Sequence, residues 1–129
     1  MNNWITAAAV IVVGMATVAG PAAAQSGEAS KGQRIFNTQC RSCHTLEKDG
    51  AQVTGPNLHG LVGRKAGTSA GYAYSDAMKN SGIVWDEATL AEYNRDPKGK
   101  VPGTKMLYNG VKNAGQLADL VAYLKEATK

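Results

Sequence analysis

Cys40-Arg41-Ser42-Cys43-His44 is the stretch of this 129-residue chain that decides its fold. The pattern C-x-x-C-H is the attachment signature of a c-type haem. Each thiol can form a thioether with a vinyl group of the haem, and the adjacent histidine can then take an axial position on the iron. Cys40 and Cys43 are therefore predicted to hold one haem c per chain covalently, with His44 as an axial ligand.

The small number of cysteines and histidines restricts the other sites that this motif could form. The chain has two cysteines and two histidines, His44 and His59. A four-thiolate zinc or iron–sulfur site would therefore have to find its missing ligands among these two histidines. A redox-active dithiol is the other alternative, but such a motif normally opens a helix that follows a strand, and no strand pattern precedes Cys40. A haem-free, colourless protein would favour this thiol–disulfide alternative.

The first 24 residues carry no charged side chain and end in three alanines, at positions 22–24. With the apolar run over residues 7–13, this pattern is typical of a signal peptide. We expect cleavage after Ala24, which leaves one domain at residues 25–129 in the periplasm. An uncleaved membrane anchor at residues 4–24 is the alternative, since about 20 uncharged residues can just span a bilayer.

The chain is basic, with a formal net charge of +4. This balance is compatible with nucleic acid, anionic lipid or an acidic protein as partner, and the expected export argues against nucleic acid. Basic side chains gather between residues 95 and 112, where Asp96 is the only acid. A partner-binding face is predicted there, formed by Lys98, Lys100, Lys105 and Lys112 beside Arg95.

Apolar periodicity predicts helices and no strands. The strongest helix follows a break at Gly115, where apolar residues recur at i, i+3, i+4 and i+7 from Leu117. Three further helices are expected at residues 28–39, 75–80 and 87–94, with Ser26 and Asp86 as N-caps of the first and the last, and Gly82 closing the second.

The segments at residues 50–71 and 97–110 are rich in glycine, proline and asparagine and are predicted loops. Two loops of this length are uncommon in a small domain unless they enclose a bound group. The expected fold is therefore all-α, with about four to five helices and Gly/Pro-rich loops wrapped around one haem.

Three residues are candidates for the second axial ligand: Met78, Met106 and His59. Met106 follows Pro102 and Gly103, which can fix a loop that presents the thioether. Met78 lies in a predicted short helix, where methionine is more often core packing, and a loop histidine is usually solvated. The residues themselves leave the three candidates open. An open or displaceable sixth position would instead favour an enzyme or a gas sensor, and rapid binding of carbon monoxide would support that alternative.

Three further stretches complete a resemblance to a known family: Gly-Pro-Asn-Leu-His-Gly at 55–60, Pro-Gly-Thr-Lys-Met at 102–106 and Leu-Val-Ala-Tyr-Leu-Lys at 120–125. They resemble the class I cytochromes c, most of all mitochondrial cytochrome c and bacterial cytochrome c2, and the similarity extends from about Lys31 to Lys129. The resemblance implies the small cytochrome c fold and an electron carrier, not an enzyme. We expect a monomer.

The resemblance also implies roles for individual residues. His44 and Met106 are the expected axial ligands, and the Pro56 carbonyl is expected to accept a hydrogen bond from His44. The expected partners of the haem propionates are Arg64, Tyr74 and Trp85. The expected polar groups near the methionine sulfur are Tyr93 and Thr104. The first and last helices are expected to cross at Gly32, Phe36, Leu120 and Tyr123.

Several positions depart from the family pattern. Met78 replaces a frequent asparagine, Asn94 a usual leucine and Tyr108 a usual phenylalanine. Lysines frequent in mitochondrial relatives are replaced by Gln39, Val53 and Gly99.

With imidazole and thioether on the iron, no position is left for oxygen or peroxide, and change of valence is the chemistry that remains. The resemblance therefore implies a soluble periplasmic one-electron carrier. It would take electrons from a cytochrome bc1-type complex and pass them to a terminal oxidase or a photosynthetic reaction centre.

Overall fold

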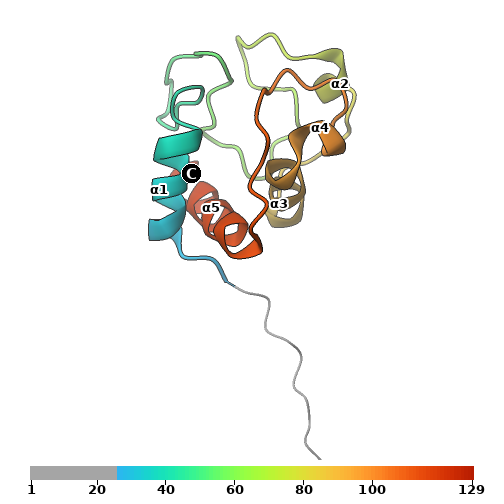
Figure 1. Ribbon diagram of the computed structural model, residues 1–129. Helices are drawn as coiled ribbons and strands as arrows, with labels where there is room; N and C mark the ends of the chain where they lie inside the picture. The colour runs from blue at the N-terminus through green and yellow to red at the C-terminus, as the bar shows by residue number, and fades with distance from the viewer. Residues whose placement is uncertain (1–25) are drawn as a thin grey trace, which may run out of the picture.

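The computed structural model describes residues 26–129, and its regular structure consists of five helices (Figure 1). They are α1 (Ala29–Gln39), α2 (Asp76–Lys79), α3 (Glu87–Arg95), α4 (Pro97–Lys100) and α5 (Ala114–Ala127). Over residues 26–129 the backbone forms no strand, and one isolated bridge pairs Lys65 with Val84. The predicted all-α class is confirmed.

No helix within the described range is long and apolar enough to cross a bilayer. The signal peptide predicted for residues 1–24, and the alternative anchor at residues 4–24, lie outside the described residues. Cleavage after Ala24 stays a prediction.

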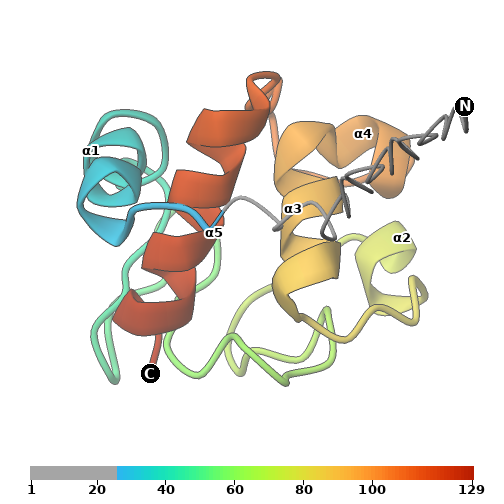
Figure 2. The ribbon, with the colours of Figure 1, turned by 90° about the horizontal axis from the view of Figure 1, so that it is seen from below.

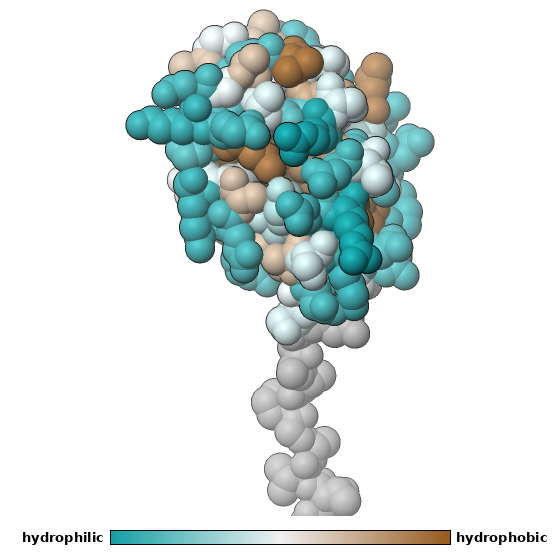
Figure 3. Space-filling model, turned by 90° about the vertical axis from the view of Figure 1, so that its left-hand side faces the viewer, coloured by the Kyte–Doolittle hydropathy of each residue, from teal (hydrophilic) through white to brown (hydrophobic). Residues whose placement is uncertain are grey.

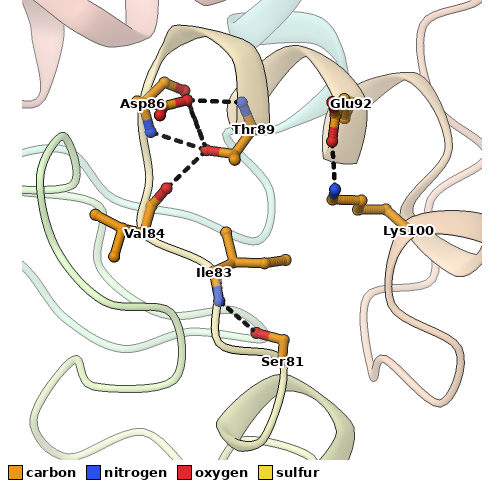
Figure 4. A network of polar contacts seen from close by, with 7 residues as sticks. All are labelled: Ser81, Ile83, Val84, Asp86, Thr89, Glu92 and Lys100. Atoms are coloured by element: carbon orange, nitrogen blue, oxygen red, sulfur yellow. Dashed lines mark hydrogen bonds and ion pairs between the residues drawn. The ribbon is translucent and has the colours of Figure 1, made fainter.

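The helix ends follow local sequence signals at most positions. Asp86 and Thr89 form a reciprocal capping box at the start of α3, as the Asp86 cap predicted. The Thr89 hydroxyl also donates to the Val84 carbonyl at 2.8 Å, which ties the helix to the segment before it (Figure 4). The same view shows an ion pair between Glu92 and Lys100, which joins α3 to α4.

Two predictions about helix ends were wrong. Ser26 does not cap α1, since the N-cap residue is Glu28, whose backbone N–H donates to the Asp119 carboxylate of α5 at 2.7 Å. Gly115 does not break the chain but lies within α5, because the side chain of Asn113 caps the helix one residue before Ala114.

The short helix α4 was also missed, because residues 97–110 were predicted to be loop throughout. Its signal is an N-cap Asp96, which accepts from the Gly99 N–H, followed by Pro97 in the first turn.

Helix α5 packs against α1 on one side and α3 on the other, and α2 and α4 lie beyond α3 (Figures 1 and 2). The α1–α5 contact depends on Gly32, where an added Cβ would lie 1.9 Å from the Asp119 carbonyl oxygen. One turn further, the Phe36 and Tyr123 rings pack with their centroids 5.6 Å apart. Leu120 is fully buried at this crossing.

Hydrophilic side chains cover most of the face shown in Figure 3, with apolar residues visible between them. Among the described residues Leu107 is the most exposed large apolar side chain, at 89%. It lies in the segment between α4 and α5, next to Met106.

Replacing Gly32 by valine should lower the free energy of unfolding of the haem-loaded protein by about 1–3 kcal/mol or more. The added side chain would force α1 and α5 apart at a point where backbone lies on both sides. Urea titration followed by far-UV circular dichroism measures the change.

The matched control is Gly115→Ala, at an exposed position in the first turn of α5 where the added methyl group meets only the Asn113 side chain. This change should be neutral or slightly stabilising. Equal stability of Gly32→Val and the unchanged protein would contradict the close-contact explanation.

Candidate functional site

A cavity of about 340 Å³ lies between the helices and the loops. Residues of α1, α2, α3 and α5 form its wall, together with loop residues between α1 and α2, Trp85 before α3, and residues 104–108. The volume is within the usual range of ligand pockets, about 300–1,000 Å³. Because protein interiors are otherwise close-packed, a cavity of this size in a domain this small fits a bound cofactor.

The Cys40–His44 motif forms a hydrogen-bonded turn at the end of α1. The Cys40 N–H donates to the Phe36 carbonyl at 2.8 Å, and the N–H groups of Cys43 and His44 both donate to the Cys40 carbonyl at 3.0 Å. All three side chains line the cavity, and the two thiols are not joined in a disulfide. The turn therefore places two thiols and an imidazole on one cavity wall.

The Cys40 thiol is poorly suited to dithiol redox chemistry. Burial, with the neighbouring Cys43, raises the pKa of the Cys40 thiol to about 11. Reactive redox cysteines have lowered pKa values instead, because the thiolate is the nucleophile. A strand before the motif, which a redox dithiol context would require, does not occur in residues 26–129.

The His44 ring is held in one tautomer. Its Nδ1 atom lies 2.8 Å from the Pro56 carbonyl oxygen, and a carbonyl can only accept, so Nδ1 carries the proton. Burial lowers the pKa of His44, and the bond to Pro56 opposes this shift only in part. A neutral ring with a free Nε2 atom is the form that binds a metal. A Cβ at Gly55 would lie 2.5 Å from His44 Cε1, so glycine is needed where the loop covers the ring.

The structure separates the three candidates for the second axial ligand. Met106 is half-buried and Met78 is buried, and both line the cavity. His59 is not part of the cavity wall, and its backbone carbonyl accepts a hydrogen bond from Arg64 at 2.9 Å. Two methionines therefore remain within the site.

Tyr93 and Thr104 meet in the cavity wall beside Met106. Their hydroxyl oxygens are 2.7 Å apart, and the Met106 N–H donates to the Thr104 hydroxyl at 3.3 Å. Burial raises the pKa of the Tyr93 phenol, against the opposite effect of Thr104. The pair is therefore a neutral hydrogen-bonding unit at the base of the Met106 segment.

The three residues expected to bind propionates also line the cavity. The Arg64 guanidinium donates to the carbonyls of His59 at 2.9 Å and Asn57 at 3.4 Å. The Tyr74 hydroxyl accepts from the Ser69 N–H at 3.2 Å, which leaves its own proton available. The Trp85 ring packs against Tyr93 with centroids 5.2 Å apart. A guanidinium and a phenol on one wall suit the carboxylates of a haem.

Asn57 organises the loop that covers His44, a role that the sequence analysis did not assign. Its buried side-chain amide donates to the Thr45 hydroxyl at 2.7 Å and to the Glu47 carbonyl at 2.9 Å, and its Oδ1 accepts from the His59 N–H at 3.0 Å. The available signal was the Pro-Asn pair within a glycine-rich loop, because asparagine often bonds nearby backbone there.

The four lysines predicted to bind a partner are not equivalent. Lys105 lines the cavity and donates to the Ala73 carbonyl at 2.8 Å. Lys112 donates to the Arg95 carbonyl at 2.7 Å, and Lys100 pairs with Glu92. Lys98 is exposed on α4 and forms no ion pair with any described residue. Only Lys105 of the four touches the cavity.

Known proteins are similar to this chain over most of its length. A family model described as Cytochrome c matches residues 29–128. A cytochrome c of the fungus Gibberella zeae is 52% identical over 103 residues, which cover 80% of this chain and 97% of the relative. The cytochrome c of Ginkgo biloba is 49% identical over 105 residues (81% and 93%), and that of Chlamydomonas reinhardtii is 50% identical over 107 residues (83% and 96%).

These relatives correct the predicted location. They come from a fungus, a seed plant and a green alga, whose eukaryotic cells have no periplasm, so the periplasmic location was wrong. The prediction relied on an apolar stretch with a small-residue end, although the Lys or Arg that normally begins a signal peptide is missing from residues 1–24.

Replacing both Cys40 and Cys43 by serine should release the cofactor, because the two thiols on the cavity wall would form its thioether bonds. Extraction with acidified acetone measures this release. The unchanged protein should keep its colour on the polypeptide, and the variant should lose its colour to the organic phase. Colour that leaves the unchanged protein would contradict covalent attachment.

Proposed function

The chain belongs to the cytochrome c family, and from this membership we propose that it carries single electrons from a cytochrome bc1-type complex to a terminal oxidase. The family binds covalently attached haem c and acts in electron transport. One observation carries the proposal: His44 and Met106 line the same cavity as the two cysteines. With both axial positions filled from the chain, electron transfer is favoured over binding of a small molecule.

Met106 is the proposed sixth ligand, rather than Met78. Met78 lies within α2, and its N–H is held by the Ser75 hydroxyl at 3.1 Å, so its backbone is committed to the helix. Met106 lies on a non-helical segment after a turn at Gly103, whose φ of 94° favours glycine. This segment can bring the thioether forward into the cavity without breaking a helix.

When bound, the haem supplies reversible one-electron oxidation and reduction. The chain would hold it through Cys40 and Cys43, and Pro56 would keep the His44 imidazole oriented toward the iron. A methionine thioether favours the ferrous state and so raises the reduction potential. The neutral Tyr93–Thr104 pair would limit movement of the Met106 segment.

Arg64, Tyr74 and Trp85 would hold the two propionates. A guanidinium on the cavity wall offsets the negative charge of a carboxylate, and the free phenolic proton of Tyr74 can donate to one. The apolar wall formed by Phe36, Leu61 and Leu90 would exclude water around the ring. A dry, fixed environment lowers the rearrangement that accompanies each change of charge on the iron.

The proposed docking face is formed by four lysines from the stretch of sequence that includes Met106. Lys98, Lys100, Lys105 and Lys112 are all exposed, although Lys100 pairs with Glu92, and Leu107 offers an exposed apolar contact. A basic rim with an apolar centre suits a fast, transient encounter with an acidic surface. A photosynthetic reaction centre is the other predicted acceptor, and it would also need an acidic docking surface. It is the second acceptor to test.

Replacing Met106 by alanine should abolish the weak near-infrared sulfur-to-iron band of the oxidised protein and lower its reduction potential, because the thioether is lost. Absorption spectroscopy and redox titration measure both effects. Met78→Leu is the matched control and should keep the band. Loss of the band in Met78→Leu, with retention in Met106→Ala, would reverse the assignment.

Electron transfer to a purified terminal oxidase should slow as salt rises, because the screening length falls from about 30 Å at 0.01 M to about 8 Å at physiological ionic strength. The change Lys98→Glu should slow the reaction at low salt and leave the spectrum unchanged, because Lys98 is exposed and does not line the cavity. Stopped-flow kinetics measures the rate.

The control for this experiment is Lys129→Glu, at the carboxyl terminus and far from α4 (Figures 1 and 2). It adds the same kind of charge change away from the docking face and should have little effect. A rate that responds neither to salt nor to charge reversal on the docking face would rule out electrostatic docking. Salt-dependent electron transfer to a reaction centre, with none to the oxidase, would identify the reaction centre as the acceptor.

A further inference from the structure

The side chains of Tyr108 and Gln39 meet in the structure. The Tyr108 hydroxyl donates a hydrogen bond to Gln39 Oε1 at 2.5 Å, although the two residues are 69 positions apart. Gln39 is the last residue of α1, and Tyr108 follows Met106 by two positions. Both side chains line the cavity. The bond therefore joins the start of the Cys40–His44 motif to the segment that carries Met106.

The bond needs a hydroxyl at position 108 and an acceptor at position 39. A tyrosine hydroxyl can donate to an amide oxygen, whereas phenylalanine has no hydroxyl. Leucine at position 39 would offer neither a donor nor an acceptor. Either change alone would remove the bond.

The position of the bond gives it a role in holding the segment. Among the described residues, no other hydrogen bond connects residues 104–108 to α1. Two other side-chain hydrogen bonds tie the segment elsewhere: Thr104 bonds to Tyr93 on α3, and Lys105 bonds to the Ala73 carbonyl in the loop before α2. Between Met106 and Tyr108, Leu107 is 89% exposed and cannot anchor the segment by burial.

We propose that Tyr108 and Gln39 form a clasp that keeps the Met106 segment closed over the cavity and so holds the Met106 thioether on the iron. Both are positioning residues, because they act through Met106. The inference rests on the proposed role of Met106 as sixth ligand. Gln39 is exposed, so water competes for its amide oxygen and the effect of one such bond is about two- to tenfold.

Imidazole is the probe for the clasp, because it can occupy the sixth position only when the Met106 segment opens. The oxidised, haem-loaded protein is titrated with imidazole, and loss of the near-infrared band measures the apparent dissociation constant. Tyr108→Phe and Gln39→Leu should each lower this constant about two- to tenfold. The double variant should show no further decrease, since each single change already breaks the same bond.

Two matched variants separate the clasp from general loosening. Gln39→Glu keeps an acceptor for the Tyr108 hydroxyl and should bind imidazole as the unchanged protein does. Tyr72→Phe removes another phenolic hydrogen bond of the cavity wall, to the Thr54 carbonyl at 3.0 Å, and should leave the constant unchanged.

The outcomes distinguish failure of the clasp from failure of the proposed ligand. Unchanged imidazole binding in Tyr108→Phe and Gln39→Leu, additive effects in the double variant, or an equal effect of Tyr72→Phe would each overturn the clasp. Absence of the near-infrared band from the unchanged protein would instead overturn Met106 as sixth ligand.

Discussion

The close crossing of α1 and α5 at Gly32 is the contact on which the rest of the structure depends. The Cys40–His44 turn begins where α1 ends, so the angle and depth of α1 against α5 set where the two thiols and the imidazole lie. At Gly32 no side chain separates the helices, and the backbone of Asp119 occupies the space. A larger residue there would move the start of the cavity wall as well as weaken the core.

The cavity combines an apolar wall with a few polar groups that are kept uncharged. Burial lowers the pKa of His44 and raises the pKa values of Cys40 and Tyr93, and in each case the neutral form is favoured. Neutral groups near the iron would let its own change of charge dominate the local electrostatics. The positive charges of Arg64 and Lys105 are the exceptions, and Arg64 lies where propionates would need it.

The surface around Met106 would serve two requirements at once. Docking needs an exposed, basic face, and stable ligation needs a segment that stays closed. Lys105 meets both, because its exposed ammonium group also donates to the Ala73 carbonyl. In the proposed clasp, the bond between Tyr108 and Gln39 would keep the segment closed without using any of the four lysines of the docking face.

The sequence by itself determined the all-α class, the family, the haem motif and most helix positions, because these depend on local spacing, capping groups and apolar periodicity. It placed Met106 on a loop but left Met78 and His59 as rivals, since spacing along a chain does not say which loops meet. The tertiary structure showed that His59 lies outside the cavity wall and that Tyr108 bonds to Gln39. It also showed that Glu28, the N-cap of α1, is held by Asp119 of α5. These outcomes depend on contacts between residues distant in sequence, which only the packed fold brings together.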